Sequence, residues 1–260
     1  MPITGPYVCK FAADLGYDGL QLNIGSYDKR FPLSRKVTQE AYLEMAEKHD
    51  IAFASMVTRM TDFYSMFAPE GSEEHQVVRE SIEKGIRAAE AMGIDIFMIP
   101  NFVKSEARTD EDVKKLVKEL QWACDLAADH GVLIAEENVF SVEDTMRLFD
   151  EVDRENLRLY FDLQNYYINR GVNTPDIIEP LMPYIVQLHA KDGKNGDLSG
   201  APMGEGDVSL FESIEVLKSQ GYEGWIVNEN YYDVPPLVTE SDDPVQKIRD
   251  DLATLRKALS

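Results

Sequence analysis

The amino-acid sequence predicts an α/β fold of the parallel (β/α)8 barrel class, in which the first strand is short or missing. Short apolar runs rich in β-branched residues alternate with longer stretches whose apolar residues recur at the helical period of about 3.6. Glycines stand where a helical stretch ends and the next run begins, as at Gly93, Gly131 and Gly221. Strands that alternate with helices indicate βαβ units and a parallel sheet, so we expect a single domain over residues 1–260.

Seven apolar runs are expected to be strands. They are Gly19–Gly25, Ile51–Val57, Ile94–Pro100, Val132–Val139, Leu157–Leu163, Ile185–Asp192 and Trp225–Glu229. The clearest helices between them are Glu73–Met92 and Asp110–His130. The long connections follow strands and not helices, at Thr58–Ser72, Asn101–Thr109, Gly193–Val208 and Asn230–Asp243. In a parallel barrel such loops lie at the carboxyl ends of the strands, where active sites form.

The start of the chain leaves one strand to be found. A closed TIM-type (β/α)8 barrel needs eight strands. Only Met1–Gly5 precede the first expected helix, near Pro6, and this is short for a strand of usual length. A gap in the barrel would leave backbone donors and acceptors for another segment to cover. We expect a partner subunit there and hence a homo-oligomer, although a rearranged amino terminus or the helix near Asp243–Leu259 would serve as well.

Composition excludes several classes of partner. The net charge of −21 argues against a nucleic-acid backbone or an anionic membrane as the main partner. No segment approaches the roughly 20 apolar residues that span a bilayer, and no signal sequence opens the chain. Cys9 and Cys124 match no metal or redox spacing. We therefore expect a cytoplasmic protein with reduced thiols that acts on a small molecule.

Four polar residues lie in or at the ends of four successive expected strands: Glu137 in VLIAEENV, Asp162 in LRLYFDLQN, His189 in IVQLHAKD and Glu229 in WIVNEN. An ionisable group after a buried apolar run is costly unless it is paired or binds a metal. Three carboxylates and one imidazole suit Mn²⁺, Mg²⁺, Co²⁺ or Zn²⁺, so we expect one divalent metal ion. Glu136 competes with Glu137, and we prefer Glu137 because an asparagine follows it, as one follows Glu229.

Several stretches together carry a family resemblance. They run from AADLGYDGLQL (Ala12–Leu22) through GVLIAEEN, YFDLQN and LHAKD to GEGDVSLFESIEVLKSQGYEGWIVNEN (Gly204–Asn230). The chain resembles the xylose-isomerase-like TIM-barrel superfamily, the sugar phosphate isomerases and epimerases that include ketose 3-epimerases and inosose dehydratase. The resemblance implies that Glu137, Asp162, His189 and Glu229 bind the metal, and that Glu137 and Glu229 are also the catalytic acid–base pair.

Other positions are expected to contact the substrate. Glu143 resembles a substrate-contacting glutamate of the ketose epimerases. Asn165 stands where those epimerases place a substrate-binding histidine. No arginine follows His189 at the spacing that the ketose epimerases imply, and Lys191 and Lys194 are the nearby cations, of which we expect Lys191 to contact the substrate. Asn101, directly after the third expected strand, completes the expected substrate-binding set.

The residues predict proton transfer next to a sugar carbonyl. A metal that holds the carbonyl oxygen would stabilise an enediolate, and a carboxylate on each face could remove the proton and return one. The first alternative is a dehydratase or lyase of a keto-sugar or inosose, which shares the first step and then expels a β-substituent. A DNA-repair endonuclease would need clustered histidines and a basic face. A non-catalytic or obligate-partner subunit would fit the short first strand.

Overall fold

The computed structural model describes residues 3–239 and 243–260, and it divides the chain into two compact units. The amino-terminal unit comprises Gly5–Ala13 and Asp18–Leu159. The carboxyl-terminal unit comprises Asp14–Tyr17 and Tyr160–Ser260, with the described residues that precede Gly5. The predictions for the first residues of Met1–Gly5 and for the end of the loop 230–243 reach residues 1–2 and 240–242, which lie outside the described residues.

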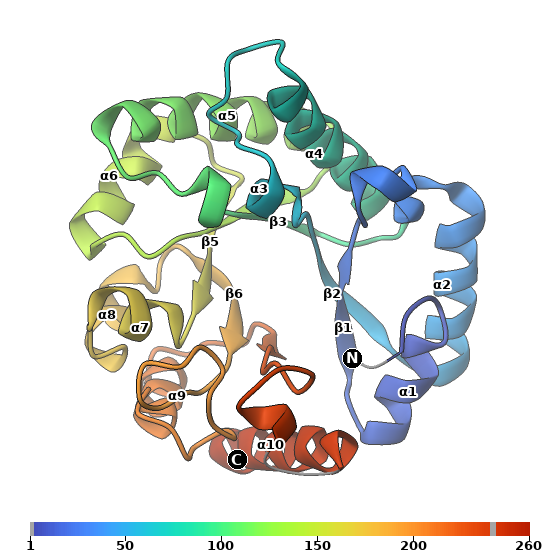
Figure 1. Ribbon diagram of the computed structural model, residues 1–260, viewed down its shortest axis with the longest axis vertical. Coiled ribbons are helices and arrows are strands. Elements are labelled where there is room, and N and C mark those ends of the chain that lie inside the picture. Colours follow the sequence, from blue (N-terminus) through green and yellow to red (C-terminus); the bar gives the residue numbers. More distant parts are fainter. Residues whose placement is uncertain (1–2, 240–242) are drawn as a thin grey trace. The chain divides into compact units, whose positions relative to one another are not determined.

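The amino-terminal unit contains parallel strands that pair with their neighbours in chain order (Figure 1). They are β1 (Gly19–Asn23), β2 (Ala52–Val57), β3 (Ile96–Pro100), β4 (Leu133–Glu137) and the first part of β5 (Leu157–Asp162). Its α-helices are α2 (Lys36–His49), α3 (Met60–Phe63), α4 (Glu73–Ala91), α5 (Asp110–Ala128) and α6 (Val142–Val152), and α1 (Val8–Leu15) crosses the boundary. Short 3-10 helices lie at η1 (Tyr27–Lys29), η2 (Pro32–Ser34) and η3 (Val103–Ser105).

Helices α4 and α5 lie next to each other in this unit (Figure 1). The side chain of Ser72 caps α4 by accepting from the backbone N–H of His75, and Thr109 forms a capping box with Asp112 at the start of α5. Helix α4 packs closely on β3, because Gly85 faces the ring of Phe97 and a Cβ there would lie 2.1 Å from its Cε2. These caps and the close packing fix where the first turns of both helices lie.

The carboxyl-terminal unit contains the end of β5 with β6 (Ile185–Ala190) and β7 (Ile226–Asn228). Strand β6 pairs in parallel with β7. The helices are α7 (Asn165–Arg170), α8 (Pro175–Leu181), α9 (Leu210–Ser219) and α10 (Pro244–Leu259), with a 3-10 helix η4 (Leu237–Thr239). Helix α9 contacts both α8 and α10 (Figure 1). The pleat of β6 directs His189 and, two residues on, Lys191 to the same face.

The sequence predicted these elements well. Each of the seven predicted strands is present, and among the described residues no strand precedes α1. Gly93, Gly131 and Gly221 have φ of 67°, 66° and 73°, the left-handed conformation that glycine adopts most easily at a helix end. The predicted loop Thr58–Ser72 differs in one respect, because it contains the short helix α3. Both cysteines are buried thiols. Within the described ranges, no helix has the length and apolar character needed to cross a membrane.

Candidate metal and proton-transfer site

Four of the predicted functional residues converge in the carboxyl-terminal unit. Asp162 ends β5, His189 lies in β6, Lys191 directly follows β6 and Glu229 directly follows β7. Parallel pairing brings these strand ends to one edge of the sheet. Asp162, His189 and Lys191 are almost fully buried, whereas the side chain of Glu229 is 24% exposed and can meet a ligand from solvent.

Asp162 is held in one orientation by the backbone that follows it. Its Oδ1 accepts hydrogen bonds from the N–H groups of Gln164 (2.8 Å) and Asn165 (2.7 Å). Its Oδ2 therefore faces the cluster, 2.7 Å from Lys191 Nζ and 3.9 Å from His189 Nδ1. The predicted substrate residue Asn165 is buried at the start of α7, and its backbone positions Asp162.

The imidazole of His189 directs Nδ1 toward the carboxylates. Nδ1 lies 3.2 Å from Glu229 Oε2. The ring of Tyr160 lies against the imidazole, with 4.4 Å between ring centroids, and restricts its rotation. Tyr160 was not among the predicted residues, because two apolar neighbours give it the appearance of an ordinary core aromatic.

Lys191 was predicted to contact substrate, and the structure places its ammonium between two carboxylates. Nζ lies 2.7 Å from Asp162 Oδ2 and 2.6 Å from Glu229 Oε2, and it also lies 5.7 Å from the centre of the Tyr231 ring. The lysine offsets the repulsion between two buried or half-buried anions. It also leaves Asp162, Lys191 and Glu229 with a combined charge of −1 when all three are ionised.

A second network fixes the residue that follows Glu229. Asn230 accepts at Oδ1 from the N–H of Asp192 (3.1 Å) and the hydroxyl of Ser199 (2.9 Å). Its Nδ2 donates to Asp251 Oδ2 (2.7 Å), on helix α10. Tyr232 also donates to this Asp251 oxygen at 2.7 Å. Burial raises the pKa of Asp251 above its ordinary value, although these hydrogen bonds oppose the shift.

This network was missed from the sequence. The available signal was an aspartate, Asp251, on the apolar side of the last helix, where it is only 2% exposed. A buried carboxylate on a helix needs partners, and here the partners come from loops that are distant in sequence. Its consequence for the site is that the strand end carrying Glu229 is tied to α10.

Two further predicted residues lie at strand ends of the amino-terminal unit. Glu137 ends β4 and is 4% exposed, and its carbonyl accepts from the backbone N–H of Asn101 (2.8 Å). Asn101 is 2% exposed, and its side-chain oxygen accepts from the N–H of Ala107 (2.8 Å). The amide oxygen of Asn101 therefore closes its own loop.

Glu143, unlike the buried Glu137 and Asn101, is exposed to solvent. It lies in the first turn of α6, two residues after the N-cap Ser141, where an acidic side chain is favoured by the helix dipole. This position accounts for the glutamate without a substrate, and its predicted contact receives no support from the structure.

Glu136 is the most deeply buried carboxyl of this segment, with no exposed surface. Burial raises its pKa to about 8, the amides of Asn138 and Asn101 lower it, and the neighbouring charge of Glu137 raises it. At neutral pH Glu136 is therefore largely protonated, and a protonated carboxyl cannot act as a base.

The free energy of unfolding should depend on pH through Glu136. The pKa of this carboxyl is the ordinary 4.5 in the unfolded chain and about 8 in the folded chain. The folded chain therefore binds more protons than the unfolded chain between pH 4.5 and pH 8. Stability is full below about pH 4.5 and falls as pH rises through 8, by at most about 5 kcal/mol. Glu136→Gln should remove this fall, making the variant at least about 1 kcal/mol more stable than the parent at pH 9. Urea unfolding of chelator-treated protein at pH 5 and pH 9 measures it.

The matched control is Glu143→Gln, which removes an exposed carboxyl from the same segment. It should retain the pH dependence of the parent. Equal pH dependence in the parent and in Glu136→Gln would contradict the assignment of the fall to Glu136.

Asp162, His189 and Glu229 carry side chains of the types that bind divalent metal ions. Ligand atoms about 2.1 Å from one ion lie roughly 3.0–3.4 Å apart when the angle between them is near 90–110°. The separation of 3.2 Å between His189 Nδ1 and Glu229 Oε2 lies in this range, and the 3.9 Å to Asp162 Oδ2 is slightly wider. Two carboxylate oxygens and one imidazole suit Mn²⁺, Mg²⁺, Co²⁺ or Zn²⁺.

Buried acid, base and cation side chains at the carboxyl ends of parallel strands define a barrel-type enzyme site. The family comparison agrees. The model of the xylose isomerase-like TIM barrel family matches residues 9–258, so the chain belongs to this family and the predicted fold class is confirmed.

Two of the relatives are named as epimerases of phosphorylated substrates. A 2-epi-5-epi-valiolone 7-phosphate 2-epimerase of an Actinoplanes species is 22% identical over 216 residues, which is 83% of this chain and 78% of the relative. The L-ribulose-5-phosphate 3-epimerase of Salmonella heidelberg is 25% identical over 231 residues, which is 82% of this chain and 77% of the relative.

Solved structures share the fold at low sequence identity. D-psicose 3-epimerase of Clostridium cellulolyticum, solved with D-tagatose, superposes with a TM-score of 0.80 at 14% identity over 98% of this chain and 93% of that one. A probable 3-DHS dehydratase of Bacillus anthracis gives a TM-score of 0.73, also at 14% identity, over 98% and 94% of the two chains. Epimerase and dehydratase therefore occur on the same fold.

Proposed function

We propose that the chain is a divalent-metal-dependent sugar isomerase or epimerase that moves a proton at the carbon next to a carbonyl, through an enediolate. The observation that carries the proposal is that His189 and Lys191 each lie within 2.6–3.9 Å of both carboxylates, Asp162 and Glu229. The family and the epimerase relatives support a sugar or sugar phosphate as substrate.

Glu229 is proposed as one of the two proton-transfer groups. Its side chain is partly exposed, so its carboxylate can accept a proton from a bound substrate. The backbone N–H of Glu229 donates to Ala190 (2.9 Å), and Asn230 is tied to α10, so the carboxylate is presented from a fixed strand end. A fixed base spends little entropy in reaching the reactive geometry.

Glu137 is proposed as the other proton-transfer group and as the fourth metal ligand. The support is its place at the end of β4, since β4 pairs in parallel with β5 and Asp162 ends β5. When Glu229 takes the proton from one face, a protonated Glu137 returns one to the other face, and solvent restores both groups. Bond breaking and bond making at carbon then balance, and the product is the epimer.

The remaining residues are proposed to hold the metal ion, to offset the charge of the carboxylates and to contact the substrate. Asp162 and His189 would hold the ion with Glu229 and Glu137, and the ion, when bound, supplies Lewis-acid stabilisation of negative charge on the substrate oxygen. Lys191 offers N–H donors close to both Asp162 and Glu229 and can hydrogen-bond to a substrate oxygen from there. Asn165 and Asn101 are proposed to line the substrate site, and Glu143 remains the predicted contact with the least support.

A dehydratase or lyase of a keto-sugar or inosose is the second candidate. It would use the same proton abstraction and then expel a β-hydroxyl as water. Asn165 favours it, since an asparagine stands where the resemblance to ketose epimerases places a histidine.

The test is solvent exchange. Purified protein with Mn²⁺, Mg²⁺, Co²⁺ or Zn²⁺ is incubated in D₂O with a panel of ketoses, ketose phosphates and inososes. We expect one metal equivalent per chain and deuterium at the carbon next to the carbonyl, with an epimer or isomer formed. If the substrate loses water and no epimer forms, the protein is the dehydratase or lyase of the second candidate function. Absence of exchange with every compound, in metal-loaded protein, would contradict both.

A further inference from the structure

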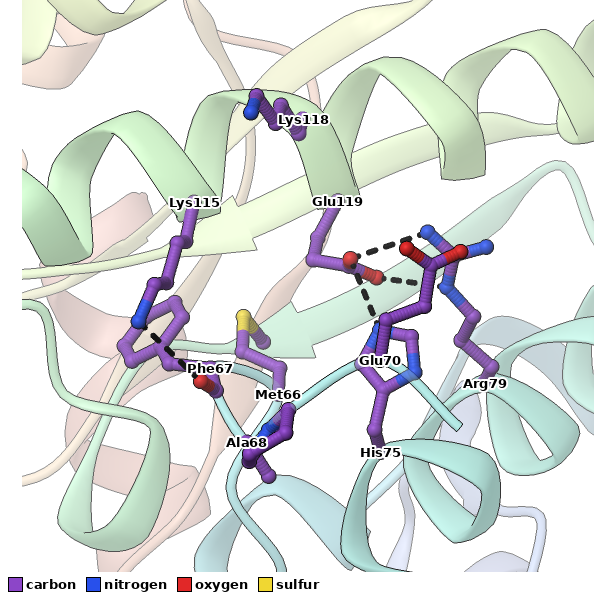
Figure 2. A pocket seen from close by; sticks show the side chains of 10 residues that line it. Met66, Phe67, Ala68, Glu70, His75, Arg79, Lys115, Lys118 and Glu119 are labelled. Carbon is purple, nitrogen blue, oxygen red and sulfur yellow. Dashed lines mark hydrogen bonds and ion pairs between the residues drawn. The ribbon is translucent and has the colours of Figure 1, made fainter. Parts of the chain in front are cut away.

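A pocket of about 330 Å³ lies in the amino-terminal unit (Figure 2). The loop before α4 forms one wall, the first turns of α4 form another, and α5 forms the third. The lining residues are Met66, Phe67, Ala68, Pro69, Glu70, His75, Arg79, Lys115, Lys118 and Glu119. The volume is at the small end of ligand pockets.

Glu119 organises the polar wall of this pocket. It is 9% exposed, and both its oxygens are engaged. Arg79 donates to it through Nε and Nη2, each at 3.0 Å, and His75 Nε2 lies 3.1 Å away (Figure 2). The guanidinium also lies over Trp122, 4.3 Å from the ring centroid. The negative charge of Glu119 is therefore paired with Arg79, and its two oxygens hold the side chains of Arg79 and His75 in place.

The cations of the pocket keep donor capacity beyond these bonds. Arg79 Nη1 and the ammonium of Lys118 make no hydrogen bond or ion pair with the described residues. Lys115 donates to the carbonyl of Phe67 at 3.5 Å, a long bond that leaves its other N–H donors available (Figure 2). With Glu70 and Glu119 ionised, three cations against two anions give a local charge of +1, in a chain whose net charge is −21.

The opposite wall is apolar and comes from the loop residues Met66, Phe67, Ala68 and Pro69. A ligand that fits both walls carries a negative group for the cations and a short carbon portion for the loop. We propose that this pocket, which none of the proposed proton-transfer residues lines, binds a small organic anion, a phosphate ester or a dicarboxylate.

Calorimetric titration tests the proposal with glycerol phosphate and malate as probes and glycerol as the neutral reference. We expect at least one anion to bind saturably with a Kd of about 1 mM or tighter at low salt, and glycerol not to bind. Stronger binding of glycerol phosphate assigns the phosphate ester, and stronger binding of malate assigns the dicarboxylate.

A matched pair of variants locates the binding. Lys115→Gln with Lys118→Gln removes two pocket charges and should weaken binding at least about tenfold. Lys48→Gln with Lys114→Gln removes two exposed charges outside the pocket and should leave the Kd within about twofold. In a Trp225→Phe background the remaining Trp122 should report binding by fluorescence, because Arg79 lies on its ring. No saturable binding of either anion, or equal weakening in the two double variants, would overturn the proposal.

Discussion

Replacing Glu229 by glutamine is expected to lower the rate of proton exchange next to the substrate carbonyl by about 10²- to 10⁴-fold, because an amide cannot accept the proton. The amide oxygen can still face His189 and Lys191, which lie 3.2 Å and 2.6 Å from Glu229 Oε2 in the parent. Substrate binding should therefore change less than turnover. Deuterium incorporation from D₂O, together with the substrate Kd and the metal content of each preparation, separates the two effects.

The control is Glu223→Gln, an exposed glutamate in the turn that precedes β7. It should exchange at the parental rate. Glu137→Gln should lose exchange from the opposite face of the substrate, so that each single variant exchanges one epimer in preference to the other. Parental exchange by Glu229→Gln with metal bound would show that this carboxylate is not a base.

Asp162→Asn is expected to reduce metal occupancy by at least about tenfold, and activity with it. The asparagine oxygen can keep the hydrogen bonds from Gln164 and Asn165, so the local backbone should survive. The Oδ2 atom is replaced by an NH₂ group that faces the Lys191 ammonium, where the parent has a 2.7 Å ion pair. Changes in groups that merely support a ligand already cost about 10- to 100-fold in affinity, and loss of the ligand itself should cost at least as much.

Metal content by elemental analysis after dialysis, and affinity by competition with a chelator, measure this change. Asp176→Asn, at an exposed position in the first turn of α8, makes the same chemical substitution away from the cluster and should bind metal as the parent does. Equal occupancy in Asp162→Asn and the parent would remove Asp162 from the proposed ligand set.

Periodicity was sufficient to predict the strands because each one is a short apolar run between helices with clear ends. The run Ile185–Asp192, for example, contains β6, and the place of His189 after the apolar residues of this run correctly predicted that it lies at the carboxyl end of a strand. The same reasoning could not give the ion pairs of Lys191, since they depend on Asp162 at the end of β5 and on Glu229 after β7, which are distant in sequence.

Side-chain roles were harder to predict where a local structural need competes with function. Asn101 was expected to meet substrate, yet its amide oxygen accepts from Ala107 and closes a loop. The opposite case is Asp251, which the helical pattern gave no reason to select. Its carboxylate accepts hydrogen bonds from Met203, Asn230 and Tyr232, all distant in sequence. Such partnerships arise from tertiary contacts and leave no periodic signal in one sequence.

The loop after β6 has a consequence for how this protein can diversify. Asp192 closes the base of the loop, because its Oδ2 accepts from the N–H groups of Gly204 (2.8 Å) and Gly206 (3.1 Å). A Cβ at Gly206 would lie 2.1 Å from Asp192 Oδ1, so a larger residue is excluded there. The exposed stretch 195–198 projects beyond this closure. Insertions at 195–198 can therefore alter the exposed surface of this loop during evolution, while the strand ends that carry His189 and Lys191 keep their register.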